Sequence, residues 1–167
     1  MGQTFVFYSE VVATTFTDWL KNRTKSGDLT PSGEAYVRWA ENTKGIGIAT
    51  KHGFKQELDK LKTECAKIDK LIIVTHGDTG WFWFGDGQLI GEMAINSVAN
   101  MGYSDLFTPG AHIFFQGCHI AGKSDRGDGE KLLKAMARTF LSRNGGRVGG
   151  CTAEGKQLSF LGLERRA

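Results

Sequence analysis

Two short apolar segments in this chain each lead into a reactive side chain that has a glycine beside it. Residues 71–75 (Leu-Ile-Ile-Val-Thr) precede His76, and residues 111–116 (Ala-His-Ile-Phe-Phe-Gln) precede a glycine and then Cys118. Segments of this length, rich in β-branched and aromatic residues and bounded by Gly and Asp, are typical of buried strands. In an open parallel α/β sheet, reactive groups gather beyond the carboxyl ends of the strands. We therefore expect His76 and Cys118 to lie at such an edge.

The rest of the chain alternates between strand and helix patterns. Strands are predicted at 4–8, 45–50, 71–75, 111–116, 147–152 and 157–161, helices at 10–25, 35–40, 54–68, 92–101 and 131–143, a hairpin over 81–87 and a polar loop at 123–130. Strands that alternate with helices favour βαβ units and a parallel sheet. The predicted fold class is α/β, a three-layer sandwich in which helices flank a mostly parallel central sheet of about six strands.

Length and composition narrow the class of protein further. With 167 residues the chain is expected to form a single domain over residues 1–167. Its net charge of +3, from 21 basic and 18 acidic residues, is too small to favour nucleic-acid or membrane partners. No apolar stretch approaches the roughly 18 residues of a membrane span. No signal-peptide pattern is present either. We expect a cytoplasmic location, although secretion by a non-classical route leaves no trace in composition.

The three cysteines do not indicate a disulfide framework or a structural metal site. Their number is odd, and Cys65, Cys118 and Cys151 are widely spaced, with no repeated C-x-x-C pattern. Cys65 falls on the apolar face of the predicted 54–68 helix, so we expect it in the core. Cys151 ends a predicted strand and is expected to be a packing residue. Cys118 is the one whose position favours chemistry.

A cysteine becomes a useful nucleophile when a nearby base takes its proton or lowers its pKa. His76 is the candidate base, and it would later protonate a leaving amine. The backbone N–H of Gly77 is a natural donor to an oxyanion. Asp78 could orient the imidazole, but an exposed turn aspartate is the competing interpretation. A structural role for His76, and a buried apolar role for Cys118, also remain open.

At these two segments the chain resembles a known superfamily. The His-Gly pair after 71–75 and the Gln-Gly-Cys at 116–118 are similar to the paired motifs of the caspase-like (clan CD) cysteine peptidases, which include caspases, metacaspases, clostripain and gingipains. The pattern Gly-Cys-x-Ile-Ala-Gly at 117–122, with a later Gly-x-x-Leu-Leu, looks closest to bacterial caspase-like domains. The residues after the cysteine differ from those of caspases. The resemblance covers residues 70–152.

The resemblance implies a cysteine endopeptidase. Peptide or protein substrates would be cleaved by a His76–Cys118 dyad through a thioester acyl-enzyme, with Gly77 as oxyanion donor and no cofactor. Gln116 is implied as a wall of the pocket for the residue before the scissile bond, and Asp78 is a second candidate for substrate contact. The basic pocket residues of caspases have no counterpart here, so cleavage after Asp does not follow. Oligomeric state is not predicted.

Other interpretations compete with this one. The chain is short for a protease with its own specificity loops, which favours an inactive interaction or regulatory module with the same fold. A zinc site built from His76, Cys118, His119 or Cys151 has no supporting spacing. His119 is expected to point away from Cys118, because successive side chains alternate in an extended backbone.

Two further segments have a structural and a functional interpretation. The acidic loop at 123–130 has oxygen ligands that suit calcium, but it lacks the EF-hand spacing, so a solvated loop is favoured. The same loop lies where caspase-like enzymes are often cleaved during activation. The aromatic cluster at 81–84 either packs a hairpin onto the sheet or covers a cleft and binds a partner.

Overall fold

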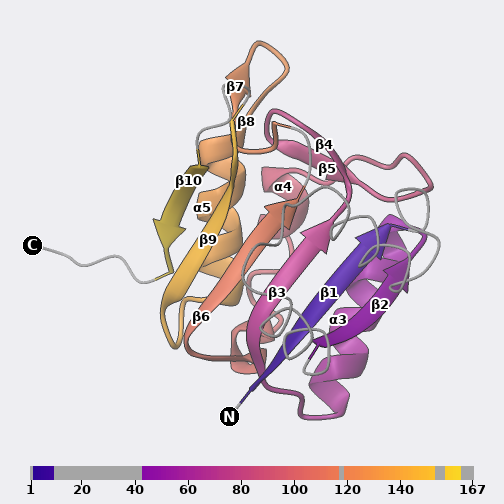
Figure 1. Ribbon diagram of the computed structural model, residues 1–167, viewed down its shortest axis with the longest axis vertical. Coiled ribbons are helices and arrows are strands. Elements are labelled where there is room, and N and C mark those ends of the chain that lie inside the picture. The colour runs from indigo at the N-terminus through magenta and orange to yellow at the C-terminus, as the bar shows by residue number, and fades with distance from the viewer. Residues whose placement is uncertain (1, 10–42, 117–118, 153–156, 163–167) are drawn as a thin grey trace, which may run out of the picture.

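A six-stranded sheet forms the centre of the molecule (Figure 1). The structure is a computed structural model that describes residues 2–9, 43–116, 119–152 and 157–162. The strand order is β10-β9-β6-β3-β1-β2, and all neighbours run parallel except β10, which is antiparallel to β9. The strands are β1 (Gln3–Ser9), β2 (Thr43–Ile48), β3 (Ile68–Val74), β6 (Phe107–Gln116), β9 (Gly146–Cys151) and β10 (Gln157–Leu161). The predicted α/β class and mostly parallel sheet are confirmed.

The central strands were predicted correctly because their apolar runs are buried. Phe7 of β1 lies opposite Ile73 of β3, which lies opposite Phe115 of β6. All three side chains are almost completely buried. Burial of such a row from parallel strands removes a large apolar area from water, and this favours the observed register over a one-residue slip.

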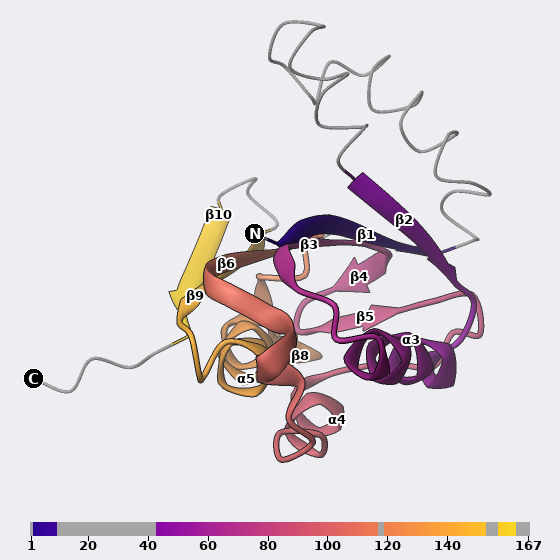
Figure 2. The same cartoon turned by 90° about the horizontal axis from the view of Figure 1, so that it is seen from below.

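Three helices lie on the same side of the sheet (Figure 2): α3 (Lys51–Thr63), α4 (Glu92–Asn96) and α5 (Gly129–Phe140). α5 buries the face predicted from its spacing, including Leu132, Met136 and Phe140. The helices predicted at 10–25 and 35–40 lie outside the described residues, so the third layer of the sandwich stays a prediction. Within the described parts of the chain, no helix combines the length and apolarity needed to cross a membrane.

The predicted 54–68 helix ends earlier than expected. α3 stops at Thr63, and Cys65 adopts a left-handed backbone with φ 54°. Its N–H donates to the Lys62 carbonyl, and the Ala66 N–H donates to the Leu61 carbonyl. These two bonds form a Schellman cap. The prediction that Cys65 is in the core is therefore wrong: the cap turns it to solvent, where it is an exposed free thiol.

Two small two-stranded ladders are separate from the central sheet. β4 (His76–Asp78) pairs with β5 (Trp81–Trp83) across the turn residues Thr79 and Gly80, and β7 (Lys123–Ser124) pairs with β8 (Gly127–Asp128). The predicted hairpin over 81–87 is correct only in part. Phe82 does bridge to Ile90 across the turn that follows it, but its continuous partner strand is β4.

The segment predicted as the polar loop 123–130 contains β7, β8 and the first turn of α5. Asp128 is the N-cap of α5, and its carboxylate accepts hydrogen bonds from the Glu130 and Lys131 N–H groups. Such a cap satisfies donors that the helix itself cannot. The helix consequently starts two residues before its predicted position.

Candidate functional site

The carboxyl ends of β3 and β6 meet at one edge of the sheet. Their last paired residues are Val74 and Gln116, which lie directly opposite each other. His76 and Cys118 each follow two residues after that pair. Gly117 and Cys118 themselves lie outside the described residues. The register therefore brings the chain positions that lead to His76 and Cys118 to the same edge, on neighbouring strands.

His76 is exposed and begins β4. Its ring stacks on the indole of Trp83, the residue opposite it on β5, with centroids 6.0 Å apart and planes 20° apart. Side chains paired across an antiparallel ladder share one face, which explains the contact. Trp83 thus restricts the orientation of the imidazole plane while leaving the ring open to solvent.

The backbone N–H of Gly77 points away from β5. Gly77 lies opposite Phe82, but Phe82 uses both its N–H and its carbonyl to bond Ile90 on the other side, at 3.0 and 2.8 Å. In an antiparallel ladder, the N–H and C=O of one residue point to the same side. Gly77 and Phe82 are therefore a non-hydrogen-bonded pair. The Gly77 N–H is directed outward from the free edge of β4, where no described residue accepts a bond from it.

Asp78 makes two contacts, and neither involves the imidazole. One carboxylate oxygen accepts the Thr79 N–H at 2.8 Å, and the other lies 3.1 Å from the Arg126 guanidinium. Arg126 belongs to the turn between β7 and β8. Among the described contacts, Asp78 thus connects the segment after His76 to the segment after Cys118.

Further bonds join the same two hairpins. The Thr79 and Ser124 hydroxyls are 2.6 Å apart, and the Trp81 indole N–H donates to the Arg126 carbonyl at 2.8 Å. Gly127 lies so close that a Cβ there would be 2.0 Å from the Thr79 carbonyl oxygen. The loops that follow the two candidate catalytic positions therefore form one connected unit.

The chain reverses direction directly after Cys118. His119 has φ 56°, a left-handed backbone that is uncommon for a residue other than glycine. The Gly122 N–H closes the turn on the His119 carbonyl at 2.9 Å. The prediction that His119 points away from Cys118 assumed an extended backbone, and that assumption is wrong. Strained residues of this kind cluster at functional sites.

Two polar residues end the paired strands. Gln116 is half-buried at the end of β6. Thr75, between Val74 and His76, is buried, and its hydroxyl has no hydrogen-bond partner in the described structure. A buried hydroxyl without a partner costs free energy at this strand end.

The described residues contain no group of three or more His, Cys, Asp or Glu side chains placed to hold a metal ion. Cys151 is a half-buried free thiol at the end of β9. In the acidic segment 123–130, Asp128 serves as a helix cap and lies 3.6 Å from the Lys123 ammonium.

Three residues of this edge were not singled out from the sequence in the roles they have here: Trp83, Arg126 and Thr79. The uniform aromatic run at 81–84 hides an alternation in which Phe82 and Phe84 are buried while Trp81 and Trp83 are half-buried. The alternation shows that Trp83 faces away from the core, but it does not show which residue Trp83 contacts. That His76 is its partner follows only from the pairing of β5 with β4.

Comparison with protein-family models gives no match to this chain, and comparison with curated proteins likewise finds no relative.

Proposed function

We propose that the chain is a cysteine endopeptidase of caspase-like type with a His76–Cys118 dyad. The observation that carries the proposal is the pairing of Val74 with Gln116, from which both candidate residues follow at equal spacing. The mostly parallel sheet and the motif resemblance support the same architecture. His76 is accessible, as a group that exchanges protons with a substrate must be.

In the proposed reaction, His76 takes the proton of the Cys118 thiol, and the thiolate attacks the carbonyl carbon of a peptide bond. The oxygen becomes an oxyanion that accepts the outward N–H of Gly77. His76 then gives its proton to the leaving amine as the C–N bond breaks, which leaves a thioester on Cys118. Water, deprotonated by His76, hydrolyses the thioester and releases the acid and the free thiol.

A dyad of this kind needs an imidazole held in one orientation. Stacking on Trp83 supports such an orientation without a hydrogen-bonded carboxylate. The bonds between the hairpins after His76 and Cys118 would keep the two segments at a constant separation, and positioning of this kind contributes strongly to catalytic rate.

Fluorogenic peptides with Arg, Lys, Asp or Leu before the scissile bond test the proposal, with and without calcium. The wild-type chain is expected to cleave at least one class and to react with an electrophilic peptide probe. Cys118→Ala and His76→Ala should both abolish cleavage, and Cys118→Ala should abolish labelling. Cys65→Ala is the matched control, because it removes an exposed thiol away from the sheet edge and should change neither result.

Cleavage that persists in both dyad variants would refute the mechanism. Absence of cleavage and labelling in the folded wild-type chain, together with an ordinary iodoacetamide reactivity of Cys118 across neutral pH, would favour the inactive interaction module.

A further inference from the structure

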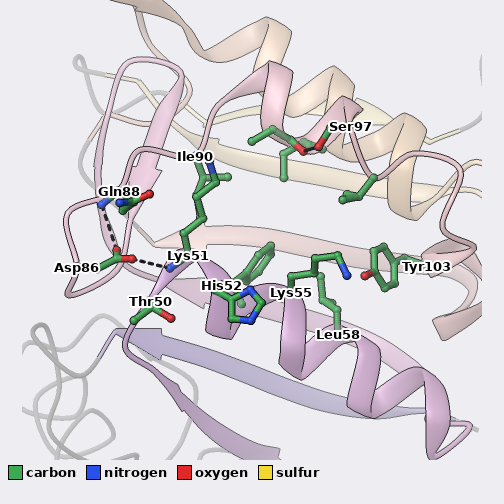
Figure 3. Close-up of a pocket in the computed structure, with 14 residues that line it drawn as sticks. Thr50, Lys51, His52, Lys55, Leu58, Asp86, Gln88, Ile90, Ser97 and Tyr103 are labelled. Atoms are coloured by element: carbon green, nitrogen blue, oxygen red, sulfur yellow. Dashed lines mark hydrogen bonds between the residues drawn. The ribbon is translucent and has the colours of Figure 1, made fainter.

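A pocket of about 680 Å³ lies between α3 and α4, on the helical side of the sheet (Figure 3). α3 provides one wall, α4 the other, and the segment 86–90 closes one end, with Tyr103 at the far end. None of His76, Gly77, Asp78 or Gln116 lines it. The pocket is therefore separate from the candidate catalytic edge.

The floor of the pocket is apolar. Phe54 and Leu58 of α3 face Ile90 and Ile95, and Val98 adds a half-buried side chain at the α4 wall. The volume falls in the range of about 300–1,000 Å³ that is common for small-molecule sites, which are mostly apolar with a few polar groups.

Large apolar side chains are exposed close to the pocket residues of α4 and of the segment 86–90. Met93 is 87% exposed and Leu89 is 50% exposed, the two highest values among the large hydrophobic residues that the structure describes. Both are chain neighbours of residues that line the pocket, Ala94 and Ile90. Exposed apolar side chains thus flank the pocket along the chain, both at α4 and at the segment 86–90.

Basic side chains of α3 border the apolar floor. Lys51, His52 and Lys55 come from the first turns of the helix and line the same side of the pocket (Figure 3). The Lys55 ammonium is bound by the Asp59 carboxylate at 2.8 Å. Lys51 uses its backbone N–H for a bond to Asp86, but its ammonium forms no ion pair with any described residue.

The nearby carboxylates already have donors. One oxygen of Asp86 accepts the Lys51 N–H at 3.0 Å and the other accepts the Gln88 N–H at 3.1 Å. Asp59 accepts from Lys55 and from the Tyr103 hydroxyl. Of the two lysines that line the pocket, Lys51 is the one whose ammonium has no carboxylate partner among the described residues, and an anionic group of a ligand would supply such a partner.

We propose that this pocket binds a small amphipathic carboxylate, with its apolar body against Phe54, Leu58 and Ile95 and its charged group at Lys51. The apolar body of the ligand would shield the floor and the α4 wall of the pocket from water. Its carboxylate would accept hydrogen bonds from the Lys51 ammonium, which has no acceptor among the described residues. The site does not depend on the dyad, so its test is a binding measurement.

Isothermal titration calorimetry with three decyl probes tests the proposal, each below its micelle-forming concentration. Decanoate should bind one per chain, and more tightly than decyl maltoside or decyltrimethylammonium, which offer the same chain with a neutral or a positive head. Lys51→Ala should raise the Kd for decanoate about fivefold, as expected for a partly exposed ion pair. Lys60→Ala on the same helix, outside the pocket lining, should leave the Kd unchanged.

Ser97→Phe provides an independent variant, because Ser97 is exposed and lines the pocket. Its ring should occupy space that the probe would otherwise fill. The probe then loses the burial of an apolar area about the size of one aromatic side chain, so its Kd should rise more than tenfold. Ala99→Phe, exposed but outside the lining, should have no effect. Equal binding of the three probes, or equal effects of the two phenylalanine variants, would overturn the proposal. Unchanged decanoate binding by Cys118→Ala separates this result from any failure of the proposed peptidase activity.

Discussion

The imidazole of His76 lies over the indole of Trp83, with ring centroids 6.0 Å apart and planes only 20° from parallel. The two residues are direct partners in the β4–β5 ladder, so the contact is set by backbone pairing. In the described structure this stacking is the one side-chain contact that orients His76. Trp83 is accordingly the residue through which the β4–β5 hairpin would influence the proposed base.

Trp83→Leu is expected to lower kcat on a peptide substrate about tenfold, because the imidazole would sample orientations that do not reach the thiol. Trp83→Phe retains an aromatic face and should lose much less. Steady-state kinetics of both variants, together with urea unfolding, separates orientation from stability. Wild-type kcat in Trp83→Leu would show that stacking does not position His76.

Asp78→Asn distinguishes two roles for this carboxylate. Because Asp78 binds Thr79 and Arg126 and makes no described contact with the imidazole, we expect kcat/KM to fall by less than about threefold. The exposed guanidinium of Arg126 limits the energy of the ion pair, which salt should weaken further. A hundredfold loss would instead assign Asp78 the role of orienting His76. A changed preference for the residue before the scissile bond would support substrate contact.

Cys65→Gly should stabilise the protein by about 0.5–1 kcal/mol. Cys65 occupies the left-handed position of the Schellman cap that ends α3, where glycine carries no steric penalty. Urea unfolding measures the difference. Cys65→Ala keeps the Cβ and serves as the control, and an equal gain from alanine would show that backbone strain is not the cause.

The same cap explains one limit of sequence-based prediction for this chain. The strands at 71–75 and 111–116 were predicted correctly because apolar side chains in a short run favour a buried strand wherever they occur. The end of α3 was not predicted correctly. A glycine usually marks the left-handed residue that ends a helix, but here that residue is Cys65, and apolar residues at helical spacing continue to Ile68 in β3.

The candidate site shows the same division. His76 and Gly77 were identified from local sequence, since they directly follow an apolar run. Trp83 and Arg126 were not identified as their neighbours, because these contacts depend on which short strands pair across the chain. Strands of two or three residues, such as β4, β5, β7 and β8, leave almost no periodic pattern in a sequence.

Gly127→Ala tests the connection between the two hairpins. A Cβ at Gly127 would lie 2.0 Å from the Thr79 carbonyl oxygen and 2.7 Å from the Trp81 indole nitrogen, so the backbone must move. We expect a loss of about 2–3 kcal/mol in the free energy of unfolding. Gly87→Ala is the control: its φ is 69° but nothing lies within 4 Å, so about 1 kcal/mol is expected. Equal losses would mean that the hairpins are not tightly packed.

Tyr103→Phe tests the pair formed by Tyr103 and Asp59 through its dependence on pH. Burial, followed by the hydrogen bond to the Asp59 carboxylate, raises the pKa of Tyr103 above its ordinary value. The Lys55 and Tyr103 hydrogen bonds lower the pKa of Asp59. Near neutral pH, wild type should be more stable than Tyr103→Phe by about 1 kcal/mol, the contribution of one hydrogen bond.

The difference between the two proteins should disappear in alkali. Above about pH 10 the unfolded chain ionises Tyr103 while the folded chain keeps it protonated, so the stability that this residue contributes is lost as pH rises. The variant has no such group at this position, and the rest of the chain is identical in both proteins. Urea unfolding from about pH 8 to about pH 11 should therefore show the wild-type advantage narrowing. If wild type stays more stable than Tyr103→Phe by the same amount over that range, the folded state does not raise the pKa of Tyr103.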